Sequence, residues 1–199
     1  MSLLNKVAVV TGAGRGIGRA VALAYARKGA DGACVSGTEE NSAKAAAEVE
    51  ALGRRAWAVA VDVSDTAAVN AAAGKILDDA GRVDILVNNA GTNIRHSPEE
   101  YTVEEWEEVM GVNLRGTYLC CREVYPHMAR SGGGKIINIG SMTSIIGIEW
   151  AAPYGASKGG VVQLSKSLAV AWAKDNIQVN VILPGWIRTD LTSQVKTLF

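Results

Sequence analysis

The sequence has few cysteines and few histidines, and each shortage excludes a kind of site. The three cysteines, Cys34, Cys120 and Cys121, form an odd and unpatterned set. They predict reduced thiols in a cytoplasmic protein and exclude a disulfide framework. The only two histidines are His96 and His127, and there is no Cys-x-x-Cys pair. We therefore expect no metal site in the protein.

An excess of charge and a long apolar run are also missing. Lysine plus arginine and aspartate plus glutamate both number 20, so the formal net charge is zero. Such a chain has no strong attraction for nucleic acid or for an anionic membrane surface. No apolar run is long enough to span a bilayer, and the first residues do not resemble a secretory signal. We therefore expect neither nucleic acid nor membrane as a partner.

The sequence does contain a regular alternation of short apolar runs and helical patterns. Hydrophobic residues make up 48% of the 199 residues, enough for a sizeable core, and we expect a single domain over residues 1–199. Continuous β-branched runs are typical of strands in a parallel sheet covered on both faces. The predicted strands are Lys6–Thr11, Gly32–Ser36, Ala56–Asp62, Val83–Asn88, Lys135–Ser141 and Gln178–Leu183.

Helical patterns fill the segments between these runs. The right-handed crossover rule favours a Rossmann-type doubly wound parallel sheet in the order 3-2-1-4-5-6, in a three-layer α/β/α architecture. Ser64 is the expected cap of the third helix, and Thr102–Glu105 is a capping box that begins the fourth. Gly111–Gly116 is expected to break or bend that fourth helix. The predicted helices run from the first glycine loop to Lys28, over Glu39–Leu52, over Asp65–Ala80, from Thr102 to about Arg130, and over Tyr154–Asp175.

A glycine loop, Thr11–Gly18, joins the first predicted strand to the first helix. Its spacing is T-G-x-x-x-G-x-G, with Gly12, Gly16 and Gly18 at the fixed positions. Between a strand and a helix, such a loop can hold a diphosphate on backbone N–H groups at the helix N-terminus. The alternative is a glycine turn with no ligand.

Tyr154 and Lys158 lie four residues apart, which places them one turn apart on one face of a helix. The residues around them are small, so both side chains stand clear. A cation at roughly 5 Å in an effective dielectric of about 20 favours the phenolate by about 3 kcal/mol. That effect would lower the tyrosine pKa toward the range of a general acid/base. The alternative is a helix whose tyrosine and lysine only reach out to water.

Other polar residues follow the carboxyl ends of predicted strands, where ligands bind in a doubly wound sheet. Strands one and four are neighbours in the predicted order, so Asn88–Gly91 should lie beside the glycine loop, although its two asparagines also fit a plain turn. Ser141 and Pro184-Gly185 end strands five and six on the same edge. Residues from 11 to 185 are therefore expected to converge on one crevice.

With these residues in place, the chain resembles the short-chain dehydrogenase/reductase family, in its single-domain branch, over essentially its whole length. The resemblance implies an oxidoreductase that interconverts a secondary alcohol and a ketone with NAD(P)(H). The motifs that carry it are, in order, Thr11–Gly18, Asp62-Val63, Asn88–Gly91, Asn113, Ser141, Tyr154-x-x-x-Lys158 and Pro184-Gly185.

Four positions match the family's catalytic residues. Tyr154 would be the general acid/base for the substrate oxygen, and Lys158 would lower its pKa and bind the nicotinamide ribose hydroxyls. Ser141 would hydrogen-bond the same substrate oxygen, although it also fits as a plain serine at a strand end. Asn113 would sit at a helix irregularity and hold a water that relays protons from Lys158.

The resemblance also implies the contacts of the cofactor. Asp62 and Val63 would contact the adenine ring, while Ile187 and Thr189 would meet the nicotinamide amide. Thr189 also fits as a cap of a following helical turn. The residues expected to bind the cofactor are Gly12, Arg15, Gly16, Ile17, Gly18, Ser36, Asp62, Val63, Asn89, Ala90, Gly91, Tyr154, Lys158, Pro184, Gly185, Ile187 and Thr189.

The second predicted strand ends without the carboxylate that would accept the ribose 2′-hydroxyl of NAD. Ser36 stands there instead, and Arg15 resembles the basic residue of family members that prefer NADP. We therefore expect NADP(H), with NAD(H) as the second choice. In the alternative, Arg15 is a solvated loop charge, and Glu39 or Glu40 reaches the ribose.

Within the family, two groups look most similar. The segments around Asn93–Arg95, Ser141–Ser144 and Gly159–Leu164 resemble gluconate 5-dehydrogenases, which points to a sugar acid or polyol substrate. The glycine loop and the missing ribose carboxylate also resemble 3-oxoacyl-acyl-carrier-protein reductases. A non-catalytic nucleotide-binding sensor or scaffold is the candidate from another class. Arg95 and His96 could hold a substrate carboxylate, or could be loop charges that face solvent.

Family members continue beyond the point where this sequence stops. They add a seventh strand, and the resemblance therefore implies that the usual seventh strand is missing here, because the sequence is either a fragment or a shortened chain. The helices around Arg115–Arg130 and Tyr154–Asp175 form a dimer interface in the family. We expect a homodimer or a homotetramer.

Overall fold

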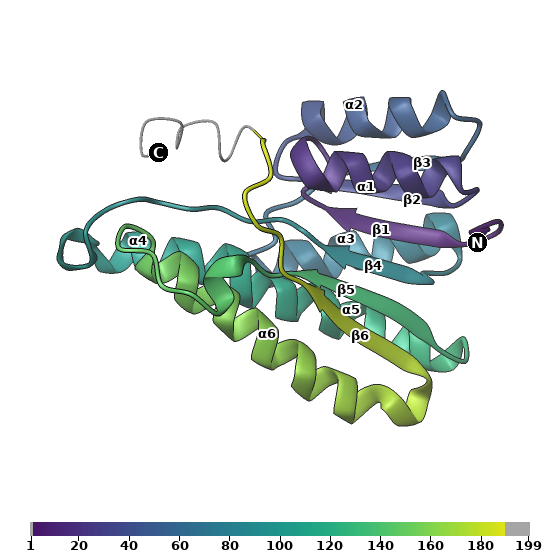
Figure 1. Ribbon diagram of the computed structural model, residues 1–199. Helices are drawn as coiled ribbons and strands as arrows, with labels where there is room; N and C mark the ends of the chain where they lie inside the picture. The colour runs from purple at the N-terminus through teal and green to yellow at the C-terminus, as the bar shows by residue number, and fades with distance from the viewer. Residues whose placement is uncertain (1, 190–199) are drawn as a thin grey trace.

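A parallel sheet lies between two layers of helices in the computed structural model, which describes residues 2–189 (Figure 1). Within these residues the sheet has six strands in the order β3-β2-β1-β4-β5-β6, which confirms the predicted order. All neighbouring strands are parallel. The strands are β1 Val7–Thr11, β2 Asp31–Ser36, β3 Ala56–Ala60, β4 Ile85–Asn88, β5 Gly134–Ile139 and β6 Ile177–Ile182.

The helices divide between the two faces of the sheet. α1 and α2 pack on one face, and α3, α5 and α6 pack on the other (Figure 1). Among the described helices, none combines the length and the apolar character that a bilayer crossing requires. The α-helices are α1 Gly16–Arg27, α2 Glu39–Glu50, α3 Thr66–Ala80, α4 Val103–Met110, α5 Gly116–Arg130 and α6 Ala152–Trp172.

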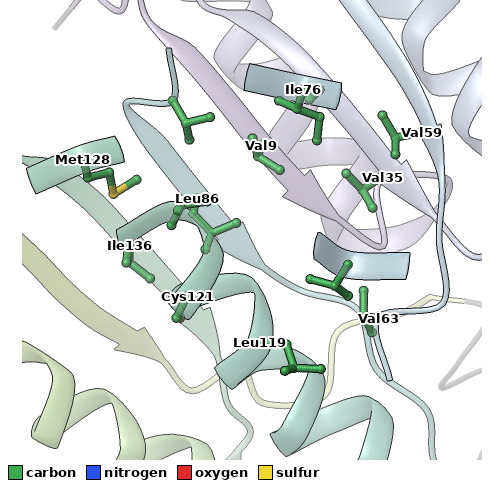
Figure 2. Close-up of a cluster of buried hydrophobic side chains, with 14 of the residues drawn as sticks. Val9, Val35, Val59, Val63, Ile76, Leu86, Leu119, Cys121, Met128 and Ile136 are labelled. Atoms are coloured by element: carbon green, nitrogen blue, oxygen red, sulfur yellow. The ribbon is translucent and has the colours of Figure 1, made fainter. Parts of the chain in front are cut away.

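The larger core lies between the sheet and the helices α3, α5 and α6. Figure 2 shows side chains of β1, β2 and β4 meeting those of α3 and α5 there. Leu86 of β4, Met128 of α5 and Ile136 of β5 are almost fully buried at its centre. β1 is buried along its whole length, as its apolar sequence predicts for a central strand. This rigid centre fixes where the carboxyl ends of the strands lie.

The third helix is capped by a residue other than the expected one. The Oδ1 of Asp65 accepts hydrogen bonds from the amides of Ala67 at 2.8 Å and Ala68 at 3.0 Å. The Ser64 hydroxyl instead donates to Oδ1 of Asp62 at 2.7 Å. The prediction of Ser64 as the cap is therefore wrong, because Asp62 competes for its hydroxyl and the helix begins one residue later.

The expected irregularity at Gly111–Gly116 is a single π-helical turn over Gly111–Arg115, between α4 and α5. In this turn, the backbone carbonyl of Asn113 accepts a hydrogen bond from the Thr117 hydroxyl at 2.8 Å. Such turns occur often at functional sites. This one buries Asn113 completely, directly below the crevice at the strand ends.

Candidate active site

The glycine loop lies tightly against the end of β4. The side-chain amide of Asn89 donates to the carbonyl of Thr11 at 3.1 Å and to that of Gly12 at 3.3 Å. Gly12 has a φ of +65°, and a Cβ there would lie 2.7 Å from the Asn89 nitrogen. A Cβ on Gly18 would overlap the Gly12 carbonyl oxygen and the same nitrogen. The T-G-x-x-x-G-x-G spacing is therefore required for the loop to close.

The loop leads directly into the N-terminus of α1. Arg15 is the N-cap residue but its side chain makes no capping hydrogen bond, and the first turn contains no acidic residue. The first backbone N–H groups of a helix have no partner inside it and carry a partial positive charge. This end of α1 therefore suits a diphosphate, and the residues present fit a dinucleotide cofactor.

A cleft of about 660 Å³ runs over the glycine loop, within the range of small-molecule sites. The structure brings most of the predicted cofactor residues to its walls. Gly18 is an exception, since it packs beneath the loop. The predicted residues that line the cleft are Gly12, Arg15, Gly16, Ile17, Ser36, Asp62, Val63, Asn89, Ala90, Gly91 and Thr189.

The end of the cleft near β2 carries polar groups rather than a free carboxylate. Ser36 and Asn41 line it together with Arg15, whose exposed guanidinium forms no ion pair with residues 2–189. Asp62 is the one acidic lining residue, and its Oδ1 already accepts two hydrogen bonds from Ser64. Glu39 and Glu40 are exposed on α2 and do not line the cleft.

Asn41 is a lining residue that the sequence reasoning missed. Its backbone is held by the α2 cap, because its amide donates to the Thr38 hydroxyl at 3.4 Å. A Cβ on Gly14 would lie only 2.6 Å from the Asn41 Cβ. The sequence signal that could have identified Asn41 is the helix cap at Thr38, which places the first turn of α2 against the glycine loop.

Ser141, Tyr154 and Lys158 line a second pocket that continues from the cleft. Ile17, Asn89 and Gly91 are common to the walls of both spaces. Pro184, Gly185, Ile187 and Thr189 close the second pocket from the segment after β6, which crosses toward α1 in Figure 1. Residues from the start and the end of the described chain therefore meet at one site.

Lys158 is buried, with 4% of its surface exposed. Its Nζ donates to the carbonyl of Ile139 at 2.8 Å and lies 5.7 Å from the centre of the Tyr154 ring. Burial lowers the pKa of Lys158 to about 8. A proton on this amine is therefore held loosely enough to exchange near neutral pH.

The pKa of Tyr154 departs from the expected direction. Burial raises it, while a hydrogen bond from Ser141 and the charge of Arg95 oppose that rise. Lys158 is not among these causes, and its own pKa is lowered by burial while its Nζ donates to the Ile139 carbonyl. The expected lowering of the Tyr154 pKa by Lys158 is thus wrong for this arrangement of the pair.

Asn113 joins three parts of the site. Its side-chain oxygen accepts from the amide of Thr92 at 2.9 Å, and its Nδ2 donates to the Thr92 carbonyl and to Oγ of Ser157, both at 3.0 Å. Both amide protons are therefore in use. A water held by this residue would have to donate to its Oδ1 or to its backbone carbonyl, each of which already accepts one hydrogen bond.

Ser141 begins a 3₁₀ turn, Met142–Ser144, that follows β5. Its hydroxyl accepts from the amide of Thr143 at 3.1 Å. The Ser144 hydroxyl donates to the Lys158 carbonyl at 2.9 Å, which ties the turn to α6. The turn therefore fixes the Ser141 side chain relative to the helix that carries Tyr154 and Lys158.

A third cavity adjoins Ser141 and Tyr154 on the side away from the cleft. Arg95 lines it, with its guanidinium carbon 5.5 Å from the centre of the Trp150 ring. His96 does not line it, because its Nε2 lies 3.0 Å from a carboxylate oxygen of Glu105. Asn93, Thr143, Trp150 and Trp186 also line this cavity, although the sequence reasoning gave them no role.

No group of three His, Cys, Asp or Glu side chains is arranged to hold a metal ion within the described part of the chain. The site combines a serine, a tyrosine and a buried lysine beside a cleft of about 660 Å³.

Comparison with known proteins gives a consistent picture. The model of the short chain dehydrogenase family matches residues 6–197. The chain is 41% identical over 187 residues to D-threitol dehydrogenase from Mycolicibacterium smegmatis, covering 94% of this chain and 72% of that protein. It is 38% identical over 196 residues to a 3-oxoacyl-acyl-carrier-protein reductase from Vibrio harveyi, covering 98% and 79%.

Solved structures agree with these matches. One is a gluconate 5-dehydrogenase from Burkholderia cenocepacia in complex with NADP and tartrate. It superimposes with a TM-score of 0.93 at 37% identity, covering 97% of this chain and 76% of that one.

Proposed function

Because this chain belongs to the short-chain dehydrogenase family, it is an oxidoreductase that acts on CH–OH groups with NAD or NADP, and we propose that Tyr154 is its general acid/base. We further propose that it prefers NADP(H) and acts on a sugar acid or polyol. The observation that carries the proposal is one pocket, continuous with the glycine-loop cleft, that contains Ser141, Tyr154 and Lys158.

NAD(P)(H) held by the glycine loop and the cleft residues would supply the hydride chemistry that interconverts the carbinol and the ketone. In the oxidation direction, Tyr154 takes the proton of the substrate hydroxyl at its phenolic oxygen. Ser141 donates a hydrogen bond to the same substrate oxygen and stabilises the charge that develops there. The hydrogen bond between Ser141 and Tyr154 supports this pairing, because two hydroxyls this close could both reach one substrate oxygen.

Lys158 acts on the cofactor side of the pocket. Its buried ammonium would bind the ribose hydroxyls, and its pKa of about 8 suits it to pass a proton. Asn113 positions the helix that carries both groups, since it bonds to Ser157 between them in sequence. Together these residues hold and move the proton while the cofactor carries the hydride.

The preference for NADP(H) rests on the β2 end of the cleft. Arg15 and Ser36 line it, and the acids Glu39 and Glu40 do not. A guanidinium without an ion-pair partner in residues 2–189 is suited to a ribose 2′-phosphate. Among the described residues that line the cleft, Asp62 alone carries a carboxylate that could repel that phosphate. Its Oδ1 already accepts a hydrogen bond from the Ser64 hydroxyl.

The choice of substrate class rests on the third cavity. Arg95 provides a cation there, which suits the carboxylate of a sugar acid. The second candidate is a 3-oxoacyl-acyl-carrier-protein reductase, which the match to the Vibrio harveyi enzyme favours. Most of the cavity wall is apolar, but the charge of Arg95 and the polar side chains of Asn93 and Thr143 beside it favour the first.

We also propose a homodimer or homotetramer that forms through α5 and α6. Tyr118 of α5 and Val170 of α6 are exposed, Val170 to 81% of its surface. Exposed apolar residues on long helices are typical of subunit interfaces.

Hydride transfer tests the catalytic part of the proposal. The change in nicotinamide absorbance would be followed with D-gluconate and D-threitol. Tyr154→Phe should remove turnover and leave nucleotide binding intact, because it deletes only the acid/base oxygen. Tyr25→Phe on α1 is the matched control and should keep full activity. Equal rates in Tyr154→Phe and wild type would rule out the proposed role.

A further inference from the structure

Two buried polar atoms beside the reaction site have no hydrogen-bond partner among residues 2–189. They are the side-chain oxygen of Asn93 and the hydroxyl of Thr143. Both residues line the cavity that also contains Ser141 and Tyr154. Most other buried polar side chains of the core have a hydrogen-bond partner. These two atoms differ from them because they lack one and line the same cavity.

The two residues come from different segments of the chain. Thr143 lies in the 3₁₀ turn after β5, is only 9% exposed, and is fixed by the bond from its amide to Ser141. Asn93 follows β4, directly after Thr92, whose backbone is held at both its N–H and its C=O by Asn113. These bonds fix the backbone on both sides of the cavity lining, while Asn93 as a whole is half-buried.

Such an arrangement needs an explanation, because a buried polar group without a partner costs about 1–3 kcal/mol. Native proteins leave few of them. An amide oxygen can only accept a hydrogen bond, while a threonine hydroxyl can donate and accept. A molecule that carries hydroxyl groups would satisfy both at once.

We propose that Asn93 and Thr143 form a binding subsite for substrate hydroxyls that flank the reacting carbon. The inference rests on the proposed function, because it takes Ser141 and Tyr154 as the reaction centre. It names the substrate class as polyhydroxylated: sugar acids or polyols. An acyl chain in the same place would leave both polar atoms unpaired, and a site built to bind hydroxyls rejects analogues that lack them.

Two substrates separate hydroxyl recognition from recognition of a carboxylate. D-Gluconate carries a carboxylate and a chain of hydroxyls. 5-Hydroxyhexanoate keeps the carboxylate and one carbinol and lacks the other hydroxyls. The wild-type protein should prefer D-gluconate in kcat/KM.

Thr143→Val removes the hydroxyl at nearly constant shape. It should lower kcat/KM for D-gluconate by about 10- to 100-fold, since one substrate hydrogen bond is lost. It should leave kcat/KM for 5-hydroxyhexanoate unchanged. Asn93→Leu should show the same pattern on its side of the cavity.

Thermal unfolding supplies the control for folding. Thr143→Val should keep or raise the melting temperature, because it deletes a buried hydroxyl that has no partner. Ser42→Ala is the comparison, since the Ser42 hydroxyl is buried but donates to the Glu39 carbonyl at 2.9 Å. It should lower the melting temperature and leave substrate preference unchanged.

Equal losses on both substrates, or no loss on D-gluconate, would overturn the subsite while leaving Tyr154 as acid/base. Turnover that survives Tyr154→Phe would instead overturn the proposed function. The subsite is also overturned if the wild type turns over neither D-gluconate nor D-threitol and if, with NADP present, neither compound raises the melting temperature of the protein.

Discussion

The Nζ of Lys158 donates a hydrogen bond to the carbonyl of Ile139, the last residue of β5, at 2.8 Å. This contact ties the catalytic helix to the sheet edge through the same group that is proposed to bind the cofactor. It also holds a charge inside the protein, which has a cost in stability.

Replacing Lys158 should make that cost visible. Burial lowers its pKa from 10.5 to about 8, so the unfolded state binds more protons between these values, and stability rises with pH across that window. Lys158→Met should therefore raise the free energy of unfolding at pH 7 by about 1–2 kcal/mol, after the lost hydrogen bond is allowed for. The gain should shrink as pH rises from 8 to 10.5.

Denaturant unfolding of both proteins at several pH values measures this difference. A Lys158→Met protein that is less stable than wild type by the same amount at every pH would show that the buried charge carries no penalty.

Arg15→Ala should weaken NADPH binding by about 10- to 100-fold and leave NADH binding nearly unchanged, because only NADPH has a 2′-phosphate for the guanidinium. Fluorescence titration with each nucleotide measures both affinities. Arg27→Ala, at the other end of α1, is the matched control and should change neither. Equal losses for the two nucleotides would remove Arg15 from the recognition of the phosphate.

Gly18→Ala should destabilise the fold by about 1–3 kcal/mol and reduce nucleotide binding, since its Cβ would overlap the Gly12 carbonyl. Gly74→Ala is the opposite case. Gly74 lies within α3 with nothing within 4 Å of an added Cβ, so the change should stabilise by about 0.5–1 kcal/mol. Thermal unfolding of both variants checks the contrast, and a shift in the same direction would contradict it.

Arg95→Ala should lower kcat/KM for D-gluconate by about 10-fold or more and leave D-threitol unaffected, because only gluconate carries a carboxylate. The neutral polyol serves as the internal control for folding. If the variant loses activity on both substrates equally, the charge of Arg95 acts on Tyr154 rather than on the substrate.

Val170→Glu should convert the proposed oligomer to monomers, since a charge at the centre of an apolar interface is strongly unfavourable. Light scattering at micromolar concentration measures the mass. Val103→Glu on α4 is the control, because Val103 is 71% exposed but lies outside α5 and α6. A wild-type monomer would contradict the interface.

The strand order and the position of the crevice could be predicted because continuous apolar runs and glycine spacing are local patterns. The place of Tyr154 beside Lys158 followed from helical periodicity. The direction of the Tyr154 pKa could not be predicted, because it depends on how deeply the phenol is buried and on where the ammonium points.

The roles of Thr143 and Asn93 were out of reach of the sequence for another reason. Both residues lie in segments that carry the resemblance to gluconate 5-dehydrogenases, but a missing hydrogen-bond partner depends on how the folded segments lie against each other. The cap of α3 also depends on a contact in the folded chain. Asp65 caps the helix instead of Ser64, because the Ser64 hydroxyl donates to Asp62.

The π turn at Gly111–Arg115 amounts to one additional residue in an otherwise continuous helix. Each helical residue advances the side-chain direction by about 100°. The turn therefore sets the phase of α5 independently of α4, so that the Asn113 side chain reaches Thr92 and Ser157 while Leu119 and Met128 still face the core. Deleting a single residue here would restore regular helix geometry, yet it would rotate either the asparagine or the apolar face of α5 out of place.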